Sequence, residues 1–402
     1  MPSVTELELP YFDYADPSLR GERFHAAMHE LRARNWLAAM PLGFATIDRE
    51  AGEFFLRSRA FTFPGMKIAE IFGIDDGPLW EEIRRNILHI NGADHSRLRG
   101  LVNPAFTPRA VERWRPAMRG FLSELFAPLA SAGRCDAVEA LAKPYPSMVI
   151  TTVMGAPLED HERLWDWSRW IQRQFGMSVL EEREQIERAV VEFYDYAGAL
   201  LEARRQAPGE DLISTLIAAE QEGDRLSDVE LLNLVLNVLV GGVDTTQSQL
   251  AHALRLFAEH PEQWAMLAAD PALAPRAVEE VLRFEPITPF TARIAMEDVE
   301  FRGVTFPAGT VVLVCAFTGN RDDAAYEAPD AFDIRADRAG AKPLTFGAGV
   351  HYCLGANLAR AELAEALAFL APRMPGLELD GEPVYGSIDG IYGLDALPVR
   401  WG

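Results

Sequence analysis

The feature that most constrains the fold is a long, mostly apolar helix that we expect between Ser227 and Glu259. Ser227 and Glu230 form the S-x-x-E pattern of a capping box directly before an apolar run, and His260-Pro261 ends the helical pattern. At 1.5 Å per residue, such a helix is roughly 50 Å long. Apolar residues surround its first half almost completely, so we expect it to be buried and to cross a whole domain.

The rest of the chain of 402 residues shows no internal repeat and no Pro/Gly/Ser-rich linker. In the first part of the chain, the patterns predict a helix over 20–35, a small strand pair within 42–61 (GFATI and EFFL) and a partly helical loop over 62–91. Helical patterns dominate 94–283, and the last helix of this region is expected over 275–285. Strands follow over 293–315, then a helix over 357–370 and a β-hairpin region over 377–401. The sum is mainly α with a minor β region in one domain, 1–402. Most of the small sheets lie in 1–60 and 293–402, and the helical core lies in 94–285.

Charge and cysteine content limit the class of protein. The net charge of −22 disfavours binding to nucleic acid or to an anionic membrane. The three cysteines Cys135, Cys315 and Cys353 have no close spacing, which argues against a disulfide framework or a zinc site. The N-terminus lacks the pattern of a signal peptide, and the most apolar stretch, 231–243, is too short for a bilayer of roughly 30 Å. We therefore expect a cytoplasmic protein.

The segment Phe346-Gly-Ala-Gly-Val-His-Tyr-Cys-Leu-Gly355 is the most informative in the chain. A cysteine directly before a helix is placed so that the helix N-terminus stabilises its thiolate. Gly349 and Gly355 permit backbone conformations and close approaches that a Cβ would block. Phe346 can pack over the sulfur and keep water away. A lone cysteine in a glycine turn would be structural, but this pattern favours Cys353 as the thiolate ligand of a metal.

A second group of residues lies inside the long helix, at Gly241-Gly-Val-Asp-Thr-Thr246. Two adjacent glycines in a buried helix cost about 1 kcal/mol each relative to alanine, so something approaches the backbone closely there. Asp244 and Thr245 add a carboxylate and a hydroxyl, which is the pair that a proton relay needs. The alternative is a helix–helix crossing made with small residues.

These motifs resemble those of the cytochrome P450 family, from about residue 94 to the C-terminus. The cysteine segment matches the family's haem-binding signature F-x-x-G-x-H-x-C-x-G, and Gly241 to Thr245 match [AG]-G-x-[DE]-T. The resemblance implies the P450 fold, a triangular helical prism with small sheets, and haem b with Cys353 as iron ligand. It also implies that Thr245 helps to activate dioxygen, that Asp244 gates proton delivery, and that Gly241 and Gly242 leave room for oxygen and the haem face.

The resemblance extends to structural and haem-holding residues. Glu280 and Arg283 match the family's E-x-x-R pair, which fixes the core behind the haem. A third arginine normally completes this network, and either Arg335 or Arg338 can take that place. Four residues at family spacings are implied as partners of the haem propionates: His95, Arg99, Arg293 and His351.

The expected partners are an electron donor and an apolar substrate. Six arginines crowd one short region of this acidic chain, which in the family lies where an acidic ferredoxin docks: Arg97, Arg99, Arg109, Arg113, Arg115 and Arg119. The alternative is a solvated helix face. By resemblance, the substrate pocket is lined by Leu236, Val240, Val243, Ile287, Thr288, Phe290, Ile391 and Tyr392. Nearly all of these are apolar, which favours a hydrophobic small molecule.

The leading hypothesis is a monomeric monooxygenase that activates O₂ with two electrons from a redox partner. A peroxide-driven peroxygenase is the alternative among enzymes, and Asp244-Thr245 speaks against it. A haem-thiolate binding or sensor protein without turnover is the alternative from another class.

Overall fold

The computed structural model describes residues 1–221, 226–338 and 340–402. The described chain divides into two compact units, each built from several segments. The first unit comprises Met1–Gly65, Glu279–Cys353 and Tyr385–Gly393, and the second comprises Met66–Val278, Leu354–Val384 and Leu394–Gly402. The prediction of a single domain over 1–402 stays a prediction.

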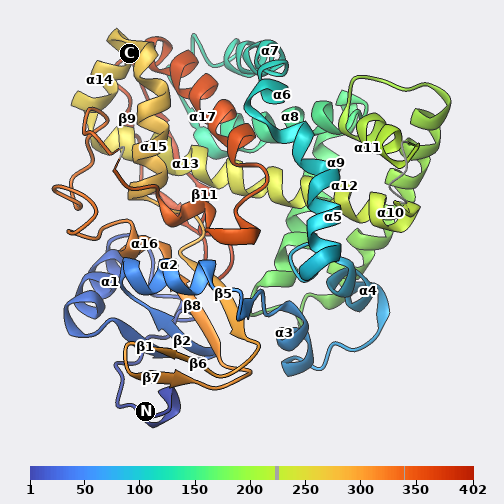
Figure 1. The fold of residues 1–402 in the computed structure, drawn as a ribbon. Coiled ribbons are helices and arrows are strands. Elements are labelled where there is room, and N and C mark those ends of the chain that lie inside the picture. Colours follow the sequence, from blue (N-terminus) through green and yellow to red (C-terminus); the bar gives the residue numbers. More distant parts are fainter. Residues whose placement is uncertain (222–225, 339) are drawn as a thin grey trace. The chain divides into compact units, whose positions relative to one another are not determined.

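The first unit is built on a five-stranded sheet of order β1-β2-β8-β5-β3 (Figure 1). Its strands are β1 (Leu37–Met40), β2 (Gly43–Thr46), β3 (Phe61–Thr62), β5 (Phe290–Ala295) and β8 (Val311–Cys315), with a separate pair formed by β6 (Val299–Phe301) and β7 (Val304–Phe306). β8 runs parallel to β2 and antiparallel to β5, which sets Arg293 opposite Val312. The strands predicted within 293–315 are confirmed.

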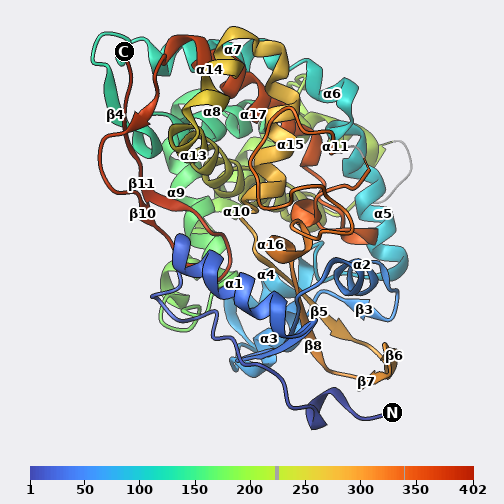
Figure 2. The same cartoon turned by 90° about the vertical axis from the view of Figure 1, so that its left-hand side faces the viewer.

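Three helices of this unit pack around the sheet (Figure 2): α1 (Glu22–Arg34), α2 (Arg49–Arg57) and α16 (Ala316–Gly319). α2 corrects the prediction that EFFL is a strand. Asp48 caps the helix by accepting a hydrogen bond from the Ala51 amide at 2.8 Å, and Ala51 and Phe55, four residues apart, are both fully buried. The capping side chain and the helical spacing of the buried face outweigh the strand propensity of two adjacent phenylalanines.

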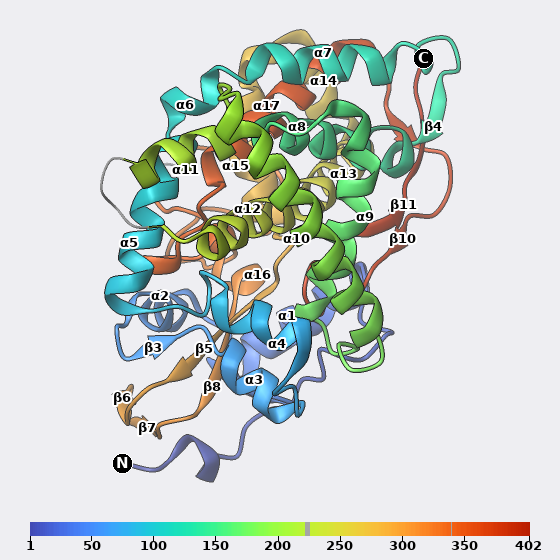
Figure 3. The ribbon, with the colours of Figure 1, turned by 90° about the vertical axis from the view of Figure 1, so that its right-hand side faces the viewer.

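The second unit is mainly helical (Figure 3). Its helices are α4 (Gly77–Arg85), α5 (Gly92–Val102), α6 (Pro108–Glu112), α7 (Arg115–Phe126), α8 (Pro144–Met154), α9 (His161–Gln172), α10 (Arg183–Gln206), α11 (Leu212–Gln221), α12 (Asp228–Gly242), α13 (Asp244–Glu259), α14 (Pro261–Ala269) and α17 (Ala356–Leu370). α12 packs against α4, α8, α9, α10 and α11, and α13 packs against α8, α9, α14 and α17. The prediction that the chain is mainly α with a minor β region is confirmed.

The long helix is broken where its sequence is weakest. α12 ends at Gly242 and α13 begins at Asp244, with Val243 between them at φ −87° and ψ −72°. The capping box at Ser227 and Glu230 is present, and helix α13 ends before His260 as expected. By length and composition Asp228–Glu259 could cross a membrane, but more than half of its apolar window is buried inside the protein. The expectation of one unbroken helix is therefore wrong at a single residue.

Two helices, α3 (Gly65–Ile71) and α15 (Ala274–Phe284), and strand β10 (Val384–Tyr385) contain unit boundaries. The tail strands β9 (Glu378–Leu379), β11 (Leu394–Ala396) and β12 (Pro398–Arg400) confirm the predicted β content after residue 377. They do not form a simple hairpin, because β12 pairs antiparallel with both β9 and β4 (Arg134–Asp136).

Candidate functional site

Cys353 lies at the end of a tight loop in the first unit. The Cys353 amide donates a hydrogen bond to the Phe346 carbonyl oxygen at 2.9 Å, which closes the loop. The cysteine is exposed and is not in a disulfide. α17 begins at Ala356, so the predicted order of loop, cysteine and helix is confirmed. Such an exposed thiol directly before a helix is suited to ligating a metal as thiolate.

The two signature glycines have different structural roles. Gly349 has φ +73°, and a Cβ there would lie 2.6 Å from the Leu56 carbonyl oxygen of α2. Any other residue would clash with backbone, so the loop requires glycine at this position. Gly355 has φ −80°, and a Cβ there would meet no atom of the described residues within 4 Å. The conformational reason expected for Gly355 is thus absent from the folded chain.

Arg293 places a buried guanidinium in the first unit, where a ligand with carboxylates could bind. Its side chain on β5 is 3% exposed, and its Nη1 donates to the Ala292 carbonyl oxygen at 2.9 Å. Among the described residues no carboxylate pairs with it, and burial lowers the pKa of the guanidinium to about 10. A buried guanidinium without a counter-ion is costly unless an anion binds to it. This side chain therefore fits a haem propionate. His351, in a turn over Gly349–His351, is partly exposed.

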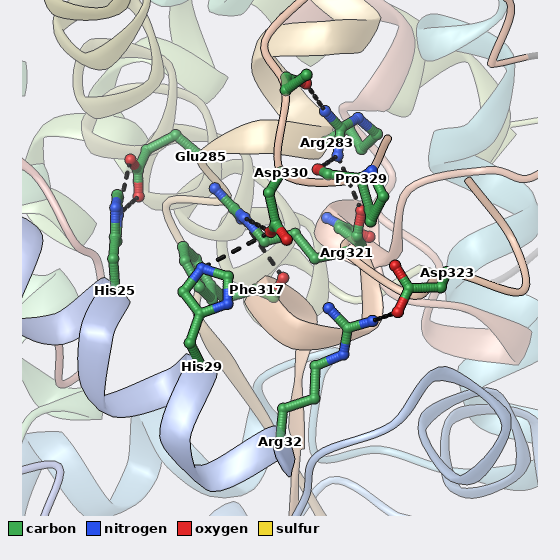
Figure 4. Close-up of polar contacts among 12 residues, drawn as sticks. His25, His29, Arg32, Arg283, Glu285, Phe317, Arg321, Asp323, Pro329 and Asp330 are labelled. Carbon is green, nitrogen blue, oxygen red and sulfur yellow. Dashed lines mark hydrogen bonds and ion pairs between the residues drawn. The ribbon is translucent and has the colours of Figure 1, made fainter. Parts of the chain in front are cut away.

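The E-x-x-R pair forms a buried network. Arg283 is fully buried, and its Nε and Nη2 each donate to a Glu280 carboxylate oxygen at 2.8 Å. Arg283 also donates to the carbonyl oxygens of Asn320, Pro329 and Ala331. Figure 4 shows its contact with Pro329. Burial raises the pKa of Glu280, but the hydrogen bonds and charge of Arg283 outweigh it, so the pKa is lowered overall.

The structure decides which arginine completes this network. Arg338 donates from Nε to Glu280 Oε2 and from Nη2 to Oε1, both at 3.2 Å. Arg335 is exposed, and its Nε lies 4.0 Å from Asp333 Oδ1 instead. Since the network ties α15 to the segment 320–338, its role is to hold that segment in place.

The acid–alcohol pair lies at the break between α12 and α13. Thr245 donates its hydroxyl hydrogen to the Gly241 carbonyl oxygen at 2.6 Å, which leaves the lone pairs of Oγ1 available as acceptors. Ser168 of α9 donates to Asp244 Oδ2 at 3.0 Å. Burial raises the pKa of Asp244 from 3.8 to about 7, although Ser168 and the charges of Arg169 and Arg173 favour the carboxylate. This carboxyl can therefore gain and lose a proton near neutral pH.

The two glycines before this pair have separate explanations. A Cβ on Gly242 would lie 2.3 Å from Ile150 Cδ1 of α8, so this glycine permits a helix crossing. A Cβ on Gly241 would meet no described atom within 4 Å beyond its own helix, and Gly241 is exposed. The alternative of a crossing with small residues therefore applies to Gly242, whereas Gly241 leaves its helix face open.

His95 and Arg99 lie one turn apart on α5, as expected. His95 is 5% exposed, and burial together with the charge of Arg99 lowers the pKa of its imidazole. Arg99 is partly exposed, and its Nε donates to Asn103 Oδ1 at 3.2 Å. Both side chains carry N–H groups that suit a propionate, and their role as its partners stays a prediction.

The arginine-rich region is less basic than its composition indicates. Arg97 pairs with Glu230, and Arg115 and Arg119 both pair with Glu365 on α17. Arg109 and Arg113 are exposed, and among the described residues neither has a carboxylate partner. Arg113 lies over the Trp114 ring at 4.6 Å from its centroid. Because Arg99 is expected to hold a propionate, Arg109 and Arg113 are the two arginines that remain for a charged partner.

The predicted pocket residues differ in accessibility. Leu236, Val240 and Val243 are at most 6% exposed. In the first unit, Tyr392 is fully buried and its hydroxyl accepts a hydrogen bond from the Gly21 amide at 2.7 Å, while its own amide donates to the Ile287 carbonyl oxygen. Thr288, Phe290 and Ile391 are partly exposed. The role of the whole set in substrate binding stays a prediction.

Comparison with known proteins identifies the family. Residues 80–370 match the family model described as cytochrome P450. Luteothin monooxygenase of Streptomyces thioluteus is 37% identical over 98% of this chain and 97% of its own length. Nocardicin C N-oxygenase of Nocardia uniformis subsp. tsuyamanensis is 42% identical over 74% of each chain. The crystal structure of CalO2 superposes with a TM-score of 0.91 at 32% identity, covering 98% of this chain and 99% of that one.

The extent of these matches shows that sequence, fold and signature residues point to one class of enzyme. The relatives are named as a monooxygenase and an N-oxygenase, and the family's cofactor is haem b. The chain therefore belongs to the cytochrome P450 family and is a haem-thiolate monooxygenase that oxidises small molecules.

Proposed function

We propose that Cys353 ligates the haem iron and that Asp244 and Thr245 deliver protons during oxidation of an apolar substrate with O₂ and two electrons from a redox partner. The observation that carries the proposal is the partly buried Asp244, whose pKa is raised to about 7 and which precedes Thr245 at the break between α12 and α13. A group that titrates near neutral pH exchanges protons in both directions during turnover.

When bound, haem would supply the activation of dioxygen, and the thiolate of Cys353 would favour that chemistry as its ligand. Asp244 takes a proton from solvent and holds it at its carboxyl group, where Ser168 fixes the orientation of Oδ2. Thr245 Oγ1 accepts a hydrogen bond from the group that brings the proton, because its own hydrogen is committed to the Gly241 carbonyl oxygen. Arg293, His95, Arg99 and His351 bind the propionates.

The proposal extends to the electron donor and the compartment. Arg109 and Arg113 are exposed cations without a carboxylate partner among the described residues, on a chain of net charge −22. Such a patch steers an acidic ferredoxin. We expect Arg109→Glu with Arg113→Glu to raise the KM for a ferredoxin several-fold at low salt, whereas Arg188→Glu on α10 leaves it unchanged. A cytoplasmic location agrees with three cysteines that form no disulfide.

The test compares Asp244→Asn and Thr245→Val with Asp75→Asn, an exposed aspartate of the same unit. With ferredoxin, reductase and NADPH, each of the first two variants should lower product formation by roughly 10²-fold or more. The reduced carbon monoxide spectrum should be unchanged in all three. Wild-type rates in both active-site variants would overturn the proposed proton delivery.

The same experiment separates the alternative functions. Product from hydrogen peroxide alone, with none from ferredoxin and reductant, would identify a peroxygenase. A haem protein that binds ligands without consuming NADPH under either condition would be a binding or sensor protein.

A further inference from the structure

Two asparagines interrupt the apolar surface of α12. Asn233 and Asn237 stand one turn apart in the run LLNLVLNVLVGG, where asparagine is a poor helix former and a buried amide is costly without hydrogen bonds. Asn233 is 2% exposed. Asn237 is partly exposed. The structure describes every residue from Asn233 to Val240, and all the other side chains in this range are buried. Their presence calls for a partner for each amide.

Asn233 is satisfied by a buried carboxyl group. Its Nδ2 donates to Glu82 Oε2 at 2.9 Å and to the Tyr194 hydroxyl oxygen at 3.0 Å. Tyr194 donates to the same Glu82 oxygen at 2.7 Å, and Asn86 Nδ2 donates to Glu82 Oε1 at 3.2 Å. The network joins α4, α10 and α12, which pack together within the second unit (Figure 3). Asn233 is therefore held rigidly.

This rigid group fixes the amide of Asn237. The Asn237 Nδ2 donates both of its hydrogens to Asn233, one to Oδ1 at 2.9 Å and one to the carbonyl oxygen at 2.8 Å. Because both acceptors lie on one side, the nitrogen faces Asn233 and Oδ1 faces away from it. Among the described residues, no group donates a hydrogen bond to Asn237 Oδ1, and this oxygen is not sealed from solvent. The network thus ends in an oriented acceptor.

The acceptor shares a helix face with the residues of the proposed chemistry. Asn237 and Gly241 are four residues apart on α12, and Gly241 is the exposed glycine whose carbonyl oxygen Thr245 contacts. Residues at i and i+4 lie on one face, and four residues span about 6 Å along a helix. Thr245, four residues further on and beyond the break at Val243, is roughly 12 Å away on the same scale.

We propose that Asn237 is a specificity-determining residue, whose Oδ1 accepts a hydrogen bond from a hydroxyl or N–H group of an otherwise apolar substrate. The donor group of that substrate lies about 6–12 Å from the carbon that is oxidised, one to two helix turns from Asn237. Glu82, Tyr194 and Asn233 are positioning residues that keep the acceptor oriented. The inference rests on the proposed function, because it places the oxidised carbon near Gly241 and Thr245.

The test uses the purified haem-loaded protein and matched ligand pairs. Each pair consists of a hydroxyl compound and its methyl ether: linear alcohols from octanol to hexadecanol, and a hydroxysteroid. Dissociation constants come from ligand-induced changes in the haem spectrum and, independently, from equilibrium dialysis. At least one hydroxyl compound should bind about tenfold more tightly than its ether, since a lost hydrogen bond to an oriented partner costs about that factor.

Asn237→Leu should reduce this ratio to about one by weakening only the hydroxyl compound. Tyr194→Phe, which leaves Asn237 in place, should lower the ratio to an intermediate value. A ratio near one for every pair in the wild type would overturn the inference without any variant, and so would a ratio that Asn237→Leu leaves unchanged. The reduced carbon monoxide spectrum distinguishes failure of the proposed function from failure of the inference about Asn237. If the spectrum lacks the thiolate signature, the proposed haem ligation fails. If the spectrum is normal, only the role of Asn237 is in question.

Discussion

Ser168 donates its hydroxyl hydrogen to the Asp244 carboxylate at 3.0 Å, from α9 to the first residue of α13. This hydrogen bond favours the charged form of a carboxyl group whose pKa is raised by burial to about 7. One neutral donor offsets only part of the cost of burying a charge, so Asp244 stays close to half protonated at neutral pH. The hydrogen bond from Ser168 therefore helps to set the pH at which Asp244 releases its proton.

Removing that donor should move the pH dependence of turnover. Ser168→Ala takes away a hydrogen bond that lowers the pKa of Asp244, so the pKa rises further. The pH–rate profile of product formation should shift to higher pH by about one unit, while ligand binding at pH 6 stays the same. Ser96→Ala, which removes an exposed serine on α5, serves as the control. An identical profile in wild type and Ser168→Ala would show that Asp244 does not limit turnover.

Arg293→Met should have opposite effects on the haem-free and haem-loaded chains. Without haem, it removes a buried charge that has no counter-ion among the described residues, so the haem-free variant should unfold at a higher temperature than the haem-free wild type. With haem, it removes a charged hydrogen-bond donor, and haem affinity should fall by about tenfold or more. Calorimetry measures the unfolding temperature of the haem-free protein, and haem transfer to apomyoglobin measures the haem affinity. Unaltered haem affinity would contradict the role of Arg293 as a propionate partner.

Glu82 should give the protein a measurable pH-dependent stability. Burial raises its pKa from 4.5 to about 7, against hydrogen bonds from Tyr194, Asn86 and Asn233 that lower it. Because the folded state holds the proton more tightly, this contribution is fully present below pH 4.5 and is lost as the pH rises through about 7. The loss is on the order of 3 kcal/mol at 1.36 kcal/mol per unit.

Urea unfolding of wild type and Glu82→Gln between pH 4 and pH 8 measures this contribution. The wild type should lose free energy of unfolding relative to the variant as the pH rises. Any constant cost of the substitution drops out, because only the slope is compared. Parallel curves would mean that Glu82 titrates normally in the folded protein.

Gly241→Ala and Gly242→Ala form a matched pair in one helix turn. Each gains the same helix propensity, about 1 kcal/mol, so their difference isolates packing. The added methyl group at position 242 meets Ile150, whereas at position 241 it meets no described atom outside its helix. Gly242→Ala should be less stable than Gly241→Ala by about 1–3 kcal/mol in denaturant unfolding. Equal stabilities would contradict the close crossing of α12 and α8.

The sequence predicted the elements whose local signals agree with their packing. The capping box at Ser227, the proline at position 261 and Gly349 of the cysteine loop each act within a few residues, and each has the expected structural effect. The EFFL segment is helical, against the strand propensity of its two phenylalanines, because Asp48 caps the helix and its buried residues follow helical spacing. The break at Val243 lies between the glycine pair and Thr245, whose hydroxyl contacts the Gly241 carbonyl oxygen. The helix propensity of each residue taken alone does not predict such a combined effect.

Long-range partners were out of reach of the sequence. Ser168 lies far from Asp244 along the chain, and no motif marks it. Arg338 and Arg335 could be separated only by the path of the segment that carries them. Asn233 and Asn237 are two amides one turn apart in an apolar run, but this pattern does not identify their partner. Their link to Glu82 depends on how α4 packs against α12.

The reduced carbon monoxide spectrum tests the central claim, thiolate ligation by Cys353, most directly. The wild type should give the strongly red-shifted Soret band of a thiolate-ligated haem, and Cys353→Ala should abolish it. Cys135→Ala, which removes a half-buried cysteine of β4 whose pKa burial raises to about 11, should leave the band intact. A red-shifted band that persists in Cys353→Ala would contradict the account.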